Sequence, residues 1–338
     1  MKSLIEKLVG AFGPTGQEGK VAALIRDEVA DCVDDIRRDA LGNLIAVKHG
    51  QRGGRKVMLA AHMDEIGLVV SHIDEKGFCR VRPVGHVLTA TLIGSRVRFA
   101  NGVVGVFGVE DENRSLWKLE SKLPDWDKWF LDIGANSRED IPVKVGDIAA
   151  FVPSFHDLGQ RLVAQSMDDR VGCAVLIEVA RRVKAPANDI FFVFTVQEEI
   201  GTKGAITATY DIRPDVGIAV DITLAADTPK APPVALALGK GAAIKVMDSG
   251  MITHYGLRQA LVTMAEEEQI PYQLEVLPGG TTDAYAIQLS REGIPTAAVS
   301  IPSRYAHSKT EMVDMRDVEA SVALLTAFVN KPLEIPGL

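Results

Sequence analysis

After Ser166, short apolar runs alternate with amphipathic helical patterns, and this alternation most constrains the fold of the chain. The runs at 190–196, 217–220 and 296–301 contain no charged residue, whereas 168–183 and 255–269 have the spacing of helices with one apolar face. Strands that helices cover on both sides of a parallel sheet have this wholly apolar composition. We therefore predict an α/β fold whose mostly parallel central sheet is flanked by helices.

Between residues 67 and 152 the pattern changes to short strands of alternating hydrophobicity. These strands cover 67–74, 77–84, 95–100, 102–108 and 147–153, with turn-forming residues between them. We expect a small β-domain of residues 67–152, inserted into an α/β domain made of residues 1–66 and 153–338. Trp117, Trp126 and Trp129 all lie in the insert, where we expect them to fill its core, with an oligomer contact as the alternative.

Charge and hydropathy exclude several classes of protein. The 37 basic and 45 acidic residues are interspersed, without a basic run that could bind nucleic acid. Apolar runs stay well below the ~18–20 residues that span a bilayer, and the charged N-terminal segment lacks a signal-peptide core. Cys32, Cys79 and Cys173 lie far apart, as expected of reduced packing residues. We predict a cytoplasmic protein that binds neither membrane nor nucleic acid.

Acidic residues and histidines follow several of the predicted strands. In open α/β sheets ligands bind beyond the carboxyl ends of the strands, so these ends are where chemistry is expected. The residues in question are His62 and Asp64 after 57–61, Glu198 and Glu199 after 190–196, Asp221 after 217–220, His307 after 296–301, and Asp168 just before a helix. Singly, each such residue is more often a turn or helix-cap residue. Gathered at one edge, they would desolvate and repel one another unless a cation compensates.

The ligand types indicate which cation this would be. Two imidazoles with carboxylates and no thiolate suit Zn²⁺, Co²⁺ or Mn²⁺ rather than Ca²⁺ or structural zinc. The number of ligands favours two ions, which in such sites lie about 3.5–4 Å apart and share a bridging carboxylate. Asp168 would bridge, with His62 and Asp221 at one ion and His307 with a glutamate at the other.

The adjacent Glu198 and Glu199 have different predicted roles. One would bind metal, and the other would stay free to take a proton from the attacking water and pass it to the leaving amine. The chemistry of the residues does not decide which glutamate does which. Asp64, two residues after His62, would accept the second imidazole N–H and so fix the tautomer of the ring.

At these residues the sequence resembles the TET (tetrahedral) aminopeptidases, also called deblocking or glutamyl-aminopeptidase-like enzymes. The resemblance covers nearly the whole chain, and its most specific part is the order of AHMDE, QEEIGTKGA and RYAHS. The matching segments are 13–19, 39–43, 61–67, 132–140, 167–172, 197–205, 220–223, 279–284 and 301–308.

The resemblance implies roles for individual residues. It implies two divalent ions per subunit, with Zn²⁺ or Co²⁺ favoured over Mn²⁺. Their ligands would be His62, Asp168, Glu199, Asp221 and His307. In catalysis, Glu198 would be the general base and Asp64 the supporting carboxylate. The implied fold is zinc-exopeptidase-like, with a β-barrel or PDZ-like insert for dimerisation, and dimers would assemble into a tetrahedral dodecamer.

The favoured function is therefore the release of N-terminal amino acids from short peptides by a metal-bridging water that Glu198 activates. A deacylase or carboxypeptidase on the same two-metal core is the alternative. An endoglucanase is disfavoured, because glycosidases need two metal-free carboxylates. A binding protein without activity is also disfavoured, because no ligand position and no base is lost.

Overall fold

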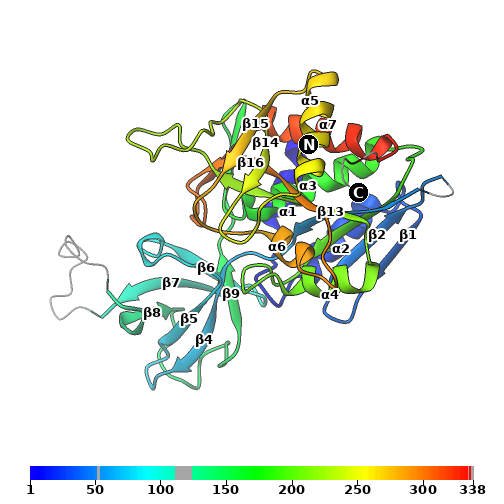
Figure 1. Cartoon of the computed structure of the whole chain (residues 1–338). Helices are drawn as coiled ribbons and strands as arrows, with labels where there is room; N and C mark the ends of the chain where they lie inside the picture. The colour runs from blue at the N-terminus through cyan, green and yellow to red at the C-terminus, as the bar shows by residue number, and fades with distance from the viewer. Residues whose placement is uncertain (52–53, 111–123, 334, 336–338) are drawn as a thin grey trace.

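The computed structural model describes residues 1–51, 54–110, 124–333 and 335. Within them the chain forms an eleven-stranded mixed sheet flanked by helices and, separately, a closed barrel of six antiparallel strands. Figure 1 shows the barrel projecting from one end of the helix-flanked sheet. The barrel strands all come from residues 67–151, between two stretches of chain that both belong to the sheet.

The elements of each part are as follows. The sheet consists of β1 (Asp35–Arg38), β2 (Leu44–Lys48), β3 (Lys56–His62), β10 (Phe155–Asp157), β11 (Arg161–Ala164), β12 (Asp189–Thr195), β13 (Val216–Leu224), β14 (Ala242–Met247), β15 (Tyr272–Val276), β16 (Thr296–Arg304) and β17 (Glu311–Asp314). The barrel consists of β4 (Gly67–Ile73), β5 (Cys79–Val84), β6 (Arg96–Phe99), β7 (Val104–Val109), β8 (Trp129–Asp132) and β9 (Ile148–Phe151). The helices are α1 (Lys2–Gly10), α2 (Gly19–Val29), α3 (Met167–Arg182), α4 (Lys203–Ile212), α5 (Tyr255–Glu267), α6 (Asp283–Gln288) and α7 (Met315–Asn330).

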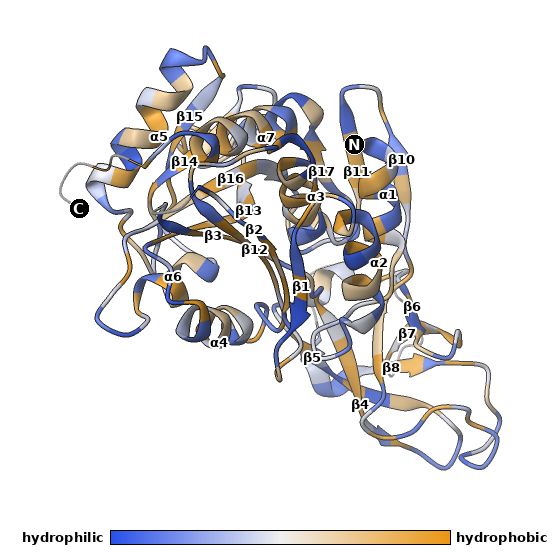
Figure 2. Cartoon of the chain, turned by 90° about the vertical axis from the view of Figure 1, so that its right-hand side faces the viewer, coloured by the Kyte–Doolittle hydropathy of each residue, from blue (hydrophilic) through white to orange (hydrophobic). Residues whose placement is uncertain are grey.

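The central strands β12, β3, β13 and β16 are parallel, as the apolar runs predict. Antiparallel strands extend the sheet on both sides. Successive residues of a strand face opposite sides of the sheet, so Leu59 and Ala61 pack toward α1, α2, α3 and α7, whereas Met58 and Ala60 pack toward α4 and α6. Figure 2 shows the apolar central strands lying between these two groups of helices.

The two neighbours of β13 separate from it at different points. It pairs with β3 only over Val216–Ala219 but with β16 over Gly217–Leu224. The uncharged run 217–220 ends at Asp221, but pairing with β16 carries the strand on to Leu224. Beyond Ala219 the β3 side of β13 is unpaired, and Asp221 lies in this part of the strand, with a carboxylate oxygen within 4.8 Å of a ring nitrogen of His62 at the end of β3.

The barrel has its own hydrophobic core, which contains Trp129 on β8 at 1% exposure, with Trp126 packed against it. These two residues confirm the expectation for the tryptophans, whereas Trp117 lies outside the described residues. All three cysteines are free, and Cys79 and Cys173 are buried. In the described part of the chain, no helix is long and apolar enough to cross a membrane.

Candidate metal centre

Three buried side chains converge at the carboxyl ends of the central strands. His62 is the last residue of β3, and Asp168 lies in the first turn of α3, where its backbone departs from helical geometry. Asp221 lies in the part of β13 that pairs with β16 but no longer with β3. One ligand atom from each lies within 4.8 Å of the others. We call His62, Asp168 and Asp221 the inner group.

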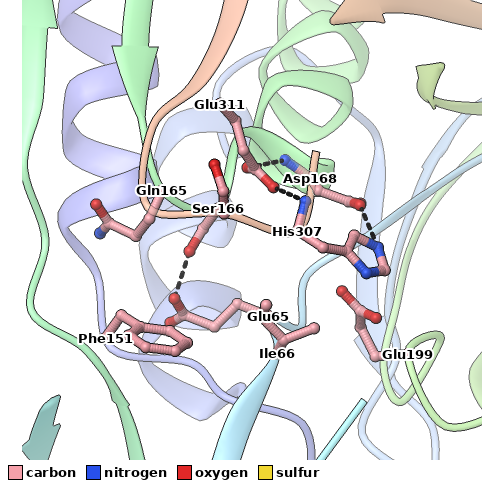
Figure 3. A pocket seen from close by; sticks show the side chains of 10 residues that line it. Glu65, Ile66, Phe151, Gln165, Ser166, Asp168, Glu199, His307 and Glu311 are labelled. Atoms are coloured by element: carbon pink, nitrogen blue, oxygen red, sulfur yellow. Dashed lines mark hydrogen bonds and ion pairs between the residues drawn. The ribbon is translucent and has the colours of Figure 1, made fainter. Parts of the chain in front are cut away.

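A second set shares Asp168 and lies closer to the surface. Glu199 follows β12 and His307 follows β16, and their ligand atoms also lie within 4.8 Å of one another and of Asp168. Both side chains are half-buried. We call Asp168, Glu199 and His307 the outer group. Figure 3 shows His307 and Glu199 beside Asp168 in a pocket that is also lined by Glu65 and Glu311.

Asp168 uses its two carboxylate oxygens separately. Its Oδ1 lies 2.9 Å from Nε2 of His62, and its Oδ2 lies 3.2 Å from Nε2 of His307. Two atoms that bind one tetrahedral zinc at about 2.0–2.1 Å lie roughly 3.3–3.4 Å apart, so both pairs have nearly the spacing of ligands to a common cation. The five residues predicted as metal ligands therefore lie in two groups with one shared carboxylate.

The protonation behaviour of the cluster reflects its excess of negative charge. Burial and then the charge of Asp168 raise the pKa of Glu199 to about 8, and the same two causes raise the pKa of Asp221 to about 8. Burial lowers the pKa of His307, but the hydrogen bond to Asp168 and the charges of the nearby carboxylates together outweigh it and raise the pKa to about 10. A cluster that draws protons to carboxylates and imidazoles alike is relieved by cations, so the donor set fits divalent metal.

Glu198 belongs to neither group among the described residues, although it is adjacent to Glu199. Its backbone N–H donates to Oδ1 of Asp64 at 2.9 Å, and that of Glu199 donates to Oδ2 of Asp64 at 3.2 Å. The chain can turn here because Gln197 adopts a positive φ of 56°. The glutamate left without metal-ligand geometry is thus Glu198.

Asp64 contacts His62 less directly than the sequence suggests. The Nδ1 of His62 lies 3.1 Å from the backbone carbonyl of Asp64 and 3.5 Å from its carboxylate. The carboxylate mainly accepts the two N–H groups after β12 and the hydroxyl of Thr15 at 2.8 Å. Asp64 therefore links the His62 segment to the segment that carries both glutamates.

Sequence reasoning missed several residues that hold the site together. Asp169 accepts the N–H of His62 at 3.3 Å, and Glu18 accepts the N–H of Gln197 at 3.3 Å. Glu311 accepts the backbone N–H groups of two residues of the outer group. The backbone carbonyl of His86 lies 3.1 Å from Nδ1 of His307. Asp169 and Glu18 fall inside segments that match the family, but nothing in the pattern around Glu311 or His86 distinguishes them.

His156 and His254 lie outside both groups. His156 is exposed on β10, and Nδ1 of His254 accepts the N–H of Leu257 at 3.3 Å, which makes it the N-cap of α5. Neither joins a metal-ligand group among the described residues.

Known proteins share the sequence pattern and the fold of this chain. The family model described as M42 glutamyl aminopeptidase matches residues 42–324. The lysyl aminopeptidase of Pyrococcus furiosus is 40% identical over 98% of both chains. The solved structure of aminopeptidase APDkam598 from Desulfurococcus kamchatkensis is 41% identical, with a TM-score of 0.93 over 97% of this chain and 94% of that one.

A third comparison concerns an assembly. The TET1 peptidase of Pyrococcus horikoshii, described as assembling into a tetrahedron or a large octahedral shell, is 32% identical with a TM-score of 0.87 over 97% of this chain and 99% of that one. These matches extend over nearly the whole length of each chain and agree with the resemblance seen in the sequence. The chain therefore belongs to the M42 glutamyl aminopeptidase family and is an aminopeptidase.

Proposed function

We propose that this aminopeptidase uses two divalent cations, one in the inner and one in the outer group, to release N-terminal residues from short peptides. The observation that carries the proposal is Asp168, whose two carboxylate oxygens face the imidazoles of His62 and His307 separately. A carboxylate placed in this way suits a bridge between two ions. The nitrogen and oxygen donors suit Zn²⁺ or Co²⁺, with Mn²⁺ as the third choice.

Cations bound there would polarise the scissile carbonyl and make water more acidic. Within this centre we assign the base to Glu198, which would take a proton from the attacking water and donate it to the leaving amine. Asp64 holds Glu198 and Glu199 through their backbone N–H groups and so keeps the base beside the ligands. Burial raises the pKa of Glu198 well above its ordinary value, and a raised pKa makes a carboxylate a stronger base.

The experiment that tests this proposal is metal analysis combined with turnover of Leu-, Lys- and Glu-p-nitroanilide by the wild type and Glu198→Gln. We expect two metal ions per chain in both proteins and a loss of about 10²- to 10⁴-fold in kcat in the variant. Metal without any turnover of these substrates, but with turnover of acylated amino acids or of C-terminal residues, would favour the deacylase or carboxypeptidase instead. Loss of metal in the variant would make Glu198 a ligand.

Self-association belongs to the same proposal. We assign residues 67–152 to an inserted oligomerisation domain and residues 1–66 and 153–338 to the catalytic domain. The barrel exposes Leu88, Ile93, Val104 and Val106, each at 41–47%, and exposed apolar groups of this kind suit a contact between subunits. By likeness to the TET1 peptidase we expect dimers that build a tetrahedral dodecamer, which sedimentation velocity would distinguish from a free dimer. The cytoplasmic location stays a prediction from the sequence.

A further inference from the structure

Glu311 lies in the sheet beside the two segments that carry Asp168 and His307 of the outer group. It is the first residue of β17, which pairs antiparallel with β11 on one side and β16 on the other. Beyond the end of β11 lies the segment that carries Asp168, and beyond the end of β16 lies the loop that carries His307. Because β17 runs opposite to both, its first residue lies where both neighbours end.

The carboxylate of Glu311 bonds the backbone of both ligands. Its Oε2 accepts the N–H of Asp168 at 3.1 Å, and its Oε1 accepts the N–H of His307 at 2.7 Å (Figure 3). Glu311 is only 2% exposed. In the described part of the chain, no other side chain bonds the backbone N–H of both residues.

The chemistry of this contact requires a carboxylate. Two N–H groups from different segments need two acceptor oxygens, and an ionised carboxylate is acceptor-only at both. A glutamine of the same shape would accept one N–H and turn its NH₂ toward the other donor. Burying a carboxylate is costly unless its environment compensates, so a glutamate kept here indicates a specific use.

We propose that Glu311 is a positioning residue that sets the cation affinity of the outer group by holding the backbones of Asp168 and His307. The inference rests on the proposed two-metal centre. Loss of a side chain that hydrogen-bonds a metal ligand typically lowers metal affinity by about 10- to 100-fold. Glu311 bonds both Asp168 and His307 of the outer group but only the shared Asp168 of the inner group, so the affinity of the inner position should change much less.

Asp317 provides a matched control. It is buried on α7 and likewise accepts two backbone N–H groups, from Gly239 at 2.6 Å and Gly241 at 2.7 Å, but it bonds none of the ligands. Asp317→Asn therefore replaces one oxygen of an equivalent acceptor pair by an NH₂ group without touching the centre. A general loss of stability would affect both variants, whereas a positioning role affects only Glu311→Gln.

The test is titration of metal-stripped protein with Co²⁺, followed by visible absorption and by equilibrium dialysis, for the wild type, Glu311→Gln and Asp317→Asn. We expect two Co²⁺ per chain in all three, with one position about 10- to 100-fold weaker in Glu311→Gln alone. Two unchanged affinities in Glu311→Gln, equal weakening of both positions, or the same effect in Asp317→Asn would overturn the inference. Fewer than two Co²⁺ in the wild type would instead overturn the proposed two-metal function on which the inference rests.

Two further measurements apply if Glu311→Gln does not fold. Glu311→Asp keeps the charge but is one methylene shorter, so it reaches only one of the two N–H groups and should weaken the same position. In the wild type, the amide of His307 should exchange with solvent more slowly than that of Ser308, as measured by NMR on the metal-stripped protein. Equal exchange of these two amides would contradict the hydrogen bond and with it the inference.

Discussion

The inner and outer groups share Asp168 but are built in different ways. His62 and Asp221 belong to β3 and β13, where the pairing of the sheet sets their backbones, and they are 2% and 7% exposed. Glu199 and His307 lie in loops beyond β12 and β16, and His307 adopts a positive φ of 57° with 27% of its side chain exposed. Regular strands thus hold one half of the centre, while contacts between loops hold the other.

The two imidazoles show the same contrast. Nδ1 of His62 lies beside the carbonyl of Asp64, two residues away along the chain. Nδ1 of His307 lies beside the carbonyl of His86, which is 221 residues away and follows strand β5 of the barrel. The barrel therefore takes part in orienting the outer group and has no such bond to the inner imidazole, so we expect the outer group to be the more easily perturbed half.

The largest effect is expected from Asp168→Asn, because this residue serves both groups. The variant should lose affinity at both positions and lose more activity than the roughly 10²- to 10⁴-fold that removing general-base catalysis costs. Metal content after dialysis and p-nitroanilide turnover measure this. Wild-type affinity retained at either position would show that the groups do not depend on a shared carboxylate.

Next in size is the difference between His62→Ala and His307→Ala. Each substitution should weaken cation binding at its own position by more than the roughly 10- to 100-fold expected when a hydrogen-bond partner of a ligand is lost. In the metal-stripped proteins, His62→Ala should also lower the free energy of unfolding by about 1–3 kcal/mol, because it leaves a buried oxygen of Asp168 unpaired. His307→Ala should lower the free energy of unfolding by less, because His307 is only partly buried. Urea denaturation compares the two, and equal losses would contradict the contrast in burial.

Gly85→Ala should affect the outer group from the barrel side. Gly85 has a φ of 79°, and a Cβ there would lie 3.1 Å from Oε2 of Glu199 and 2.9 Å from Ile66. We expect the outer position to bind Co²⁺ about 10-fold more weakly, as when a ligand is displaced by a neighbouring change. Gly94→Ala is the control, since its φ of 66° brings similar strain but its Cβ would meet nothing within 4 Å. Equal Co²⁺ affinities of the outer position in the two variants would show that contact with Glu199 does not cause the loss.

The smallest effect is expected from His86→Ala. This substitution keeps the backbone carbonyl that faces His307 and removes only an exposed ring whose centroid is 5.7 Å from that of His307. Turnover and outer-position affinity should stay within roughly twofold of the wild type, since surface substitutions usually change energies by about 0.5 kcal/mol or less. A tenfold loss in either quantity would mean that the ring, rather than the carbonyl, orients His307.

Much of the fold could be predicted because its signals are local. The apolar runs that became β3, β12, β13 and β16 and the alternating strands of the barrel are visible within windows of a few residues. Weaker signals were missed. For example, β17 is a strand of four residues, EMVD, with two acidic members, and it becomes a strand only because β11 and β16 pair with both of its edges.

The sequence by itself determined the types of the ligands and their places after or within strands, because apolar periodicity and the identity of the next polar residue are properties of adjacent positions. Tertiary structure decided how these ligands divide into two groups and what holds them. Glu311 bonds Asp168 across 143 positions and His307 across only four, and His86 reaches His307 across 221. A hydrogen bond depends on distance in space, and only the pairing of β17 between two ligand-bearing strands brings these partners within reach.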